Sequence, residues 1–248
     1  MKFILGKKLN MTQLWTGDRF VGVTVIEAEP CVVVQIKNVK NDGYEAIQLG
    51  TGTKKEKNIN KPQIGHYKKV AILNKERSTN IKTIREFRVD ELKADNTLNI
   101  GDIVRVDTFD VGDKVKLVST SKGKGFQGVV KRYGFKGAKT THGTKDQVRM
   151  PGSVGATGPA RIFKGMRMGG RMGGDRVSIA NLEVIKVDLK KSLLYIKGGV
   201  AGARNALVMI KGDGELKVFS EENSSANEGV QEVTQTVKIS DSNEIKNT

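Results

Sequence analysis

The chain has 248 residues, of which 37% are hydrophobic, and its 43 lysines and arginines outnumber its 27 acidic residues to give a net charge of +16. Such a basic surplus favours a polyanionic partner, which is nucleic acid, an anionic membrane surface or an acidic protein. No run of the sequence approaches the ~20 apolar residues that span a bilayer, and we expect no signal peptide. A single cysteine excludes an intrachain disulfide, and one cysteine with two histidines cannot form a standard zinc site on their own.

The first 118 residues are rich in short strand patterns. Residues 20–27 and 32–39 are apolar or alternating with β-branched side chains, and Asn41-Asp42-Gly43 supplies a turn before 44–49, which predicts a hairpin. We expect a short helix within 64–74 and further strands at 84–89, 103–109 and 115–118. Strands at intervals of roughly 10 residues favour a barrel or sandwich over alternating βαβ units.

Residues 119–176 differ from the rest of the chain in composition. They hold 14 of the 29 glycines, and thirteen cations against two acids, which is +11 of the net +16. Few apolar residues recur with a helix or strand period, so burial alone cannot offset the entropy of ordering this stretch. A loop of this length inside a compact domain is either disordered or functional. Because glycines between cations let the backbone approach phosphates closely, we interpret the stretch as a polyanion-binding insert rather than a merely solvated basic loop.

Strand patterns return after the insert. Residues 177–187 alternate apolar and polar, 188–192 are predicted to form a turn, and 193–197 and 206–211 are predicted to be strands. Strand patterns on both sides of the insert indicate one β domain that is split by this long insert. From residue 219 the chain is polar, with six acids and two lysines, and is expected to be disordered.

Residues 123–128, GKGFQG, match the G-x-G-x-x-G spacing of a dinucleotide-binding loop. That fold requires a helix directly after the glycines, and Gly134 and Gly137 interrupt such a helix. The sequence also lacks a P-loop motif and the companion motifs of a protein kinase. His66 and His142 can each act as a general base in principle, but neither has a partner at a recognisable spacing, so we interpret both as hydrogen-bonding or phosphate-contacting side chains. The motifs therefore indicate no enzyme.

Four aromatic residues lie among the cations of the insert: Phe126, Tyr133, Phe135 and Phe163. Aromatic rings can stack on the bases of RNA, or they can anchor the insert to the barrel. Both interpretations stay open, although anchoring is favoured for Phe126. A short repeat, RMGG, adds two arginines whose planar fork suits phosphate.

Several motifs occur in the order in which one ribosomal protein family has them. Residues 119–132, STSKGKGFQGVVKR, resemble the signature of universal large-subunit ribosomal protein three of the bacterial type. Further similar stretches are LGKKLNMT at 5–12, PQIGHY at 62–67, REFR at 85–88, THG at 141–143, RMPGSVG at 149–155 and GMRMGG at 165–170. The chain departs from the family at Asn10, where Gly is usual, at Lys116, where Asp or Asn is usual, and at Ala156, where many bacterial relatives have a methylatable glutamine.

The resemblance implies a mainly β fold, in which a translation-factor-like β-barrel is split by a long irregular basic extension and carries a small α/β excursion. Residues 1–118 and 177–218 would form the barrel domain and 55–95 the small basic excursion. Residues 119–176 would be a Gly/Lys/Arg-rich extension that threads through rRNA, mostly disordered away from the ribosome. Residues 219–248 would be the acidic, disordered tail.

The resemblance also implies a function. Members of the family are structural constituents of the large ribosomal subunit and not enzymes. They bind 23S-type rRNA directly near its 3′ end, help nucleate subunit assembly, and send the extension toward the peptidyl-transferase centre. The implied partners are that rRNA and neighbouring large-subunit proteins in the cytoplasm, with no membrane and no small-molecule substrate. No cofactor or metal is expected on the protein, and any structural Mg²⁺ would be held by the rRNA.

Two sets of site residues are expected. The rRNA-binding set comprises Lys7, Lys8, His66, Lys122, Lys124, Lys131, Arg132, Lys136, Lys139, His142, Lys145, Arg149, Arg161, Lys164, Arg167, Arg171 and Arg176. By position in the family, the extension tip near the peptidyl-transferase centre comprises Arg149, Met150, Pro151, Gly152, Ser153, Val154, Gly155 and Ala156.

Overall fold

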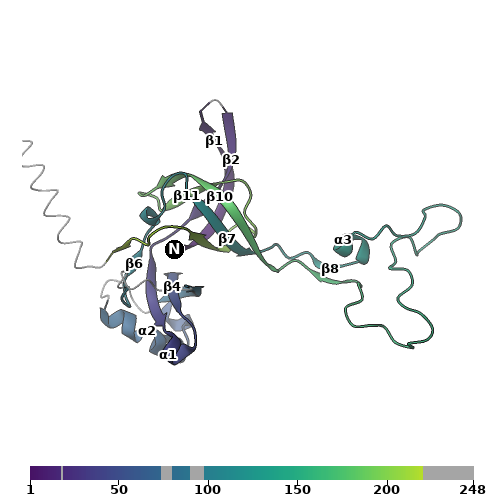
Figure 1. Ribbon diagram of the computed structural model, residues 1–248, viewed down its shortest axis with the longest axis horizontal. Helices are drawn as coiled ribbons and strands as arrows, with labels where there is room; N and C mark the ends of the chain where they lie inside the picture. The colour runs from purple at the N-terminus through teal and green to yellow at the C-terminus, as the bar shows by residue number, and fades with distance from the viewer. Residues whose placement is uncertain (18, 74–79, 90–97, 220–248) are drawn as a thin grey trace, which may run out of the picture.

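The computed structural model describes residues 1–17, 19–73, 80–89 and 98–219. Within these residues, six antiparallel strands close into a barrel in the order β1-β12-β7-β10-β11-β2 (Figure 1). The strands are β1 (Lys2–Thr16), β2 (Arg19–Glu27), β7 (Lys114–Thr120), β10 (Arg176–Asp188), β11 (Leu193–Lys197) and β12 (Leu207–Gly212). The prediction of a mainly β fold with a barrel is confirmed.

The barrel core consists of apolar side chains that meet across neighbouring strands. Ile4 of β1 pairs with Ile210 of β12, and Ile210 pairs with Leu117 of β7. All three side chains are at most 1% exposed. In β7, the buried Val115 and Leu117 lie on either side of the exposed Lys116, as the alternation of a strand with one buried face requires. Each such burial contributes about 1.5–3 kcal/mol, so these paired positions are a main source of barrel stability.

A second sheet of five strands, counted among the described residues, has the order β13-β6-β3-β4-β5. Its strands are β3 (Cys31–Lys37), β4 (Ala46–Thr53), β5 (Ile81–Arg88), β6 (Ile103–Val104) and β13 (Val218–Phe219). The predicted hairpin is confirmed: β3 and β4 are antiparallel, and α1 (Val39–Asp42) connects them and ends at Gly43, whose φ is 77°. The strands predicted at 32–39, 44–49 and 84–89 are therefore present, but they lie in the second sheet rather than in the barrel.

One face of the second sheet packs against the barrel. Phe87 of β5 stacks on Phe3 of β1 with ring centroids 4.7 Å apart, and both side chains are at most 1% exposed. Val33 and Leu49 belong to the same buried cluster as the barrel residues. The barrel and the second sheet therefore share one continuous core.

Helix α2 (Lys61–Leu73) packs against the second sheet, and it confirms the helix predicted within 64–74. Its Tyr67 is 2% exposed and lies in one buried cluster with Val34 of β3. A single 3₁₀ turn, η1 (Glu56–Asn58), precedes it. Helix α2 and β5 lie within the range 55–95 expected for the small basic excursion, whose bounds stay a prediction.

Strand β1 was not predicted from the sequence. Its first five residues are buried, but from Lys7 onward most side chains are exposed, because β1 and β2 run beyond the barrel as a hairpin (Figure 1). The tip of this hairpin carries an edge-to-face pair of Trp15 and Phe20, whose centroids are 4.3 Å apart. A strand whose two halves have different surroundings has no single alternation pattern, which explains the omission.

The strand predicted at 103–109 is mostly not a strand. Only β6 pairs in a sheet, and the following η2 (Val106–Thr108) forms a 3₁₀ turn. The Thr108 hydroxyl donates to the carbonyl of Arg105 at 2.9 Å. Such a local side-chain bond competes with strand pairing, so the β-branched composition alone misled the prediction.

The first residue of the predicted acidic tail, Phe219, belongs to strand β13 in the structure. Phe219 pairs with Ile103 in the second sheet, and the Arg105 guanidinium carbon lies 4.8 Å from the centre of its ring. The expectation of disorder for the rest of the tail, 220–248, lies outside the described residues. Among the residues that the structure describes, no helix is long and apolar enough to span a membrane.

Candidate nucleic-acid interface

The basic insert leaves the barrel as a two-stranded stem. Arg176 of β10 pairs with Thr120 of β7 at the last barrel position, and beyond it the Ser121 amide donates to the Asp175 carbonyl at 2.8 Å. The pairing continues in a ribbon of β8 (Gly125–Gln127) and β9 (Gly170–Met172). Figure 1 shows this stem projecting from the barrel and carrying a long loop at its far end. The extension, which was expected to be irregular, therefore begins with a regular two-stranded stem.

The glycines of GKGFQG have different roles in the stem. Gly125 has a φ of +68°, a conformation that favours glycine, whereas Gly123 and Gly128 do not have a positive φ. A Cβ added at Gly123 or Gly128 would meet no atom within 4 Å. Helix α3 (Val129–Tyr133) follows and ends at Gly134 in the left-handed conformation. A helix of five residues is far shorter than the one that a dinucleotide-binding fold places after its glycines. The open space at two glycines is compatible with close approach of an external backbone.

Gly173 holds the two chains of the stem close together. Its φ is +75°, and a Cβ there would overlap the carbonyl oxygen of Lys122. We expect Gly173→Ala to weaken the stem by about 1–3 kcal/mol, because the new side chain is strained and clashes with the opposite chain. In hydrogen exchange, the Lys124 amide, which donates to the Met172 carbonyl at 2.9 Å, should lose about tenfold or more of its protection. Gly123→Ala is the matched control and should leave that protection unchanged; equal protection in the two variants would contradict this role of Gly173.

Most cations of the insert are exposed, and none has an acidic partner among the residues that the structure describes. Lys124, Lys136, Lys145, Arg149 and most of the other predicted cations of 119–176 are exposed. Within the described residues, none of them forms an ion pair. Charges of one sign that are left unneutralised along a projecting loop repel each other unless a polyanion is present.

Arg132 is an exception, because it is half-buried and closes the base of the loop. Its Nη1 donates to the carbonyl of Met168 at 2.9 Å. Its guanidinium carbon lies 5.0 Å from the centre of the Tyr133 ring, and that of Arg167 lies 5.8 Å from the same ring. This arrangement fixes where the loop begins and ends, so Arg132 has a structural role beside any contact with phosphate.

Two aromatic residues of the insert, Phe126 and Phe163, are exposed and do not belong to the barrel core. Phe126 is 79% exposed and Phe163 is 52% exposed. The preference for Phe126 as an anchor is therefore wrong; the ring of Phe126 instead lies beside Gly169 on the opposite chain of the stem. Exposed rings among unpaired cations are the combination that stacks on bases while the cations bind the backbone.

Comparison with known proteins agrees with this geometry. The model of the family described as Ribosomal protein L3 matches residues 64–192. A large ribosomal subunit protein uL3 of Herpetosiphon aurantiacus is 49% identical over 209 residues, which are 84% of this chain and 94% of that protein. The uL3 protein of Carboxydothermus hydrogenoformans is 50% identical over 211 residues, 85% of this chain and 96% of that protein. The chain belongs to the ribosomal protein L3 family.

Membership in the ribosomal protein L3 family identifies the chain as a structural, non-enzymatic ribosomal constituent of the large subunit. The G-x-G-x-x-G spacing accordingly does not mark a nucleotide-using enzyme. Among the described residues, no group of three or more His, Cys, Asp or Glu side chains could hold a metal ion.

Lys8 extends the basic surface of this L3-family protein to the root of the stem. Its Nζ donates to the carbonyls of Val200 and Gly202 at 2.6 and 3.1 Å. Burial, and secondly the nearby charge of Lys122, lower the pKa of Lys8 below its ordinary value. Two like charges are thus held close together at the root, where a phosphate would stabilise both.

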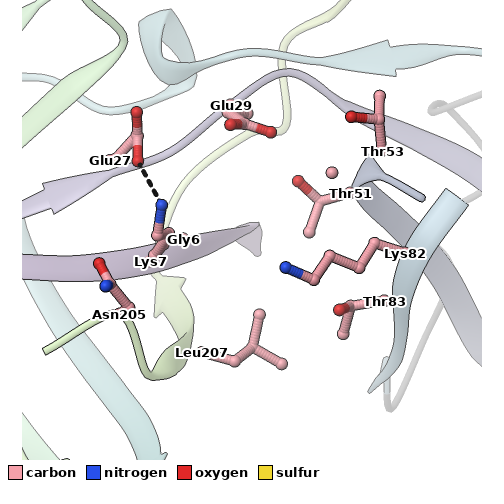
Figure 2. Close-up of a pocket in the computed structure, with 11 residues that line it drawn as sticks. Gly6, Lys7, Glu27, Glu29, Thr51, Thr53, Lys82, Thr83, Asn205 and Leu207 are labelled. Atoms are coloured by element: carbon pink, nitrogen blue, oxygen red, sulfur yellow. Dashed lines mark hydrogen bonds and ion pairs between the residues drawn. The ribbon is translucent and has the colours of Figure 1, made fainter. Parts of the chain in front are cut away.

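Lys7 points into different surroundings. It lines a cavity between the barrel and the second sheet, where its Nζ lies 3.3 Å from a carboxylate oxygen of Glu27 (Figure 2). Glu29 lines the same cavity, and Lys82, which the sequence did not indicate, reaches into it from β5. Two carboxylates therefore balance two lysines, and Lys7 is less available to phosphate than the cations of the stem.

His66 also lies apart from the stem, on α2. Its Nε2 is 3.1 Å from Oε1 of Gln48, and the Gln48 amide donates to Glu86 at 2.7 Å. The Lys37 ammonium, 2.8 Å from Glu86, lowers the pKa of the Glu86 carboxyl, and Glu86 and Tyr44 raise the pKa of Lys37. The structure therefore places His66 at the end of a polar network on the second sheet and does not bring it together with the predicted cations of the insert.

Proposed function

We propose that the protein binds 23S-type rRNA directly in the large ribosomal subunit, near the 3′ end of that rRNA, and helps to nucleate subunit assembly. The observation that carries this proposal is the long projecting loop whose cations have no acidic partners among the described residues. We propose the predicted cations of 119–176, together with Lys7, Lys8, His66 and His142, as the rRNA-binding residues. Residues 149–156 would form the tip that points toward the peptidyl-transferase centre.

In this proposal the parts of the chain have different tasks. The barrel domain of 1–118 and 177–218, with its excursion at 55–95, gives the stem a rigid base. The extension of 119–176 reaches into the rRNA, where each lysine or arginine that binds a phosphate releases condensed counterions. The glycines with open surroundings allow the chain to approach the RNA backbone, and exposed rings such as that of Phe126 stack on unpaired bases. The loop thereby orders on binding.

The partners follow from this location. We infer contacts with rRNA and with neighbouring large-subunit proteins in the cytoplasm, and no membrane or small-molecule substrate. Any structural Mg²⁺ would be held by rRNA phosphates and not by protein side chains, because the loop offers them cations rather than carboxylates.

The salt dependence of rRNA binding tests the proposal. If about half of the thirteen cations of 119–176 engage phosphates, the logarithm of the binding constant should fall with the logarithm of salt concentration with a slope of about −4 to −6. The measurement is a filter-binding titration with a 23S-type rRNA fragment from the 3′ region at several potassium chloride concentrations. An affinity that does not change with salt would contradict phosphate binding by the extension.

A further inference from the structure

A cavity of about 300 Å³ lies at the root of the stem, between the barrel and the second sheet. Its lining includes Arg176 and Thr120, the pair that ends the barrel, and Ser119 and Leu207 beside them. Arg85 of β5 lines it from the second sheet. Arg85 is not among the cations of the insert, and its place in this cavity comes entirely from the fold.

The strand geometry explains why Arg85 faces the barrel. Residues two positions apart in a strand point to the same face, and Phe87 of the same strand is buried against Phe3 of the barrel. Arg85 lies on that barrel-facing side, at its exposed edge. Since β5 is the last strand of its sheet, Arg85 meets the end of the barrel where the stem leaves it.

The acidic residue in the lining does not neutralise the two arginines. Glu86 follows Arg85 and points to the opposite face of the sheet, where its carboxylate bonds Lys37 and Gln48 at 2.8 and 2.7 Å. Within the described residues, neither Arg85 nor Arg176 forms an ion pair. In the described part of the chain, two guanidinium groups therefore border one cavity without an ion-pair partner.

In the neighbouring cavity of Figure 2, by contrast, positive and negative side chains are equal in number. Its Lys7 and Lys82 are accompanied by Glu27 and Glu29 in the lining. Leu207 lines both cavities, so they lie next to each other where the barrel contacts the second sheet. Of these two cavities, the one that adjoins the stem therefore has the excess of positive charge.

We propose that the cavity at the root binds one phosphate of the rRNA backbone between Arg85 and Arg176. The proposal rests on the rRNA binding proposed above and adds a contact from the second sheet. Guanidinium groups match phosphate oxygens with paired N–H donors, and the hydroxyl of Thr120 adds a further donor. A phosphate held from both sheets would fix the direction in which the stem leaves the barrel relative to the RNA.

Arginine-to-glutamine variants test the site. Arg85→Gln and Arg176→Gln should each weaken binding of the 23S-type fragment about tenfold and make the slope of log affinity against log salt less negative by about one. Because both arginines hold the same phosphate, the double variant should also change the slope by about one rather than two. Arg85→Lys, which keeps the charge, should keep the slope and lose affinity.

The matched control is Arg19→Gln, at the start of β2 in the hairpin that projects from the barrel apart from the stem (Figure 1). It should change neither the affinity nor the slope. Circular dichroism should show the same melting temperature for all these proteins, since the arginines concerned are exposed.

If the wild type shows a steep slope but Arg85→Gln behaves like Arg19→Gln, the cavity is not a phosphate site although the proposed function stands. A slope change of about two in the double variant would show two separate phosphates and overturn the shared site. A flat slope for the wild type would instead refute rRNA phosphate binding itself.

Discussion

Replacement of residues 128–169 by an Asn-Gly turn is expected to leave the barrel folded and to remove most of the salt dependence of rRNA binding. The excised loop contains nine of the thirteen cations of the insert and one of its two acids. If about half of the four remaining cations still bind phosphates, the slope of log affinity against log salt should change from about −4 to −6 to about −1.5. No other single change in the chain should affect binding as strongly.

The barrel should survive because the cut lies across a paired position of the stem. Gln127 pairs with Gly170 in the β8–β9 ribbon, so a two-residue turn of the type that joins antiparallel strands can connect them. Of the excised residues, Val129 is buried, at 3% exposure, and it is not a member of the barrel core cluster. The free energy of unfolding should therefore change by less than about 1 kcal/mol, as measured by urea denaturation.

The control for this deletion is a variant in which the nine cations of the loop become glutamine while the loop length is kept. It should show the same loss of slope as the deletion, because the effect comes from charge rather than from chain length. An unfolded deletion variant would show that the loop contributes to the core. A slope that stays steep in both variants would place the phosphate contacts on the barrel or the second sheet instead.

The sequence predicted the separate parts of this molecule better than their arrangement. Strands that alternate over part of their length, such as β7 and β10, were found close to their observed bounds, because a buried face imposes a period of two residues. The hairpin of β3 and β4 was found from its turn residues. The division of these strands between two sheets was not found, because pairing across long distances in the chain leaves no local pattern.

The candidate interface, too, was predicted only in part from the sequence. The excess of cations in 119–176 was visible in the composition, and the exposure of these residues agrees with it. The different surroundings of Lys7 and Lys8 could not be seen in the sequence. Neighbours in a strand point to opposite faces, and the partner of Lys7, Glu27, and that of Lys8, Val200, come from distant parts of the chain. The place of Arg85 beside Arg176 depends in the same way on the packing of one sheet on the other.

Phe3→Ala is expected to lower the free energy of unfolding by about 3–5 kcal/mol, the largest effect of a single substitution that we expect on stability. Phe3 is 1% exposed and stacks on the fully buried Phe87, so its removal leaves a cavity between the barrel and the second sheet. Since the two share one continuous core, the variant should unfold in one cooperative transition in urea, at a lower midpoint than the wild type.

A double-mutant cycle and a matched phenylalanine separate the stacking from the loss of volume. Phe3→Ala and Phe87→Ala should be non-additive by about 0.5–1.5 kcal/mol, the contribution of an aromatic pair beyond burial. Phe20→Ala removes the same side chain from the hairpin tip, where Phe20 is 63% exposed and forms an edge-to-face pair with Trp15. This variant should cost less than about 1 kcal/mol. If Phe3→Ala is as mild as Phe20→Ala, or if it splits unfolding into two transitions, then the barrel and the second sheet are independent units. In that case the stem, which is attached to the barrel alone, could not be held in a fixed direction by a phosphate bound between the two sheets.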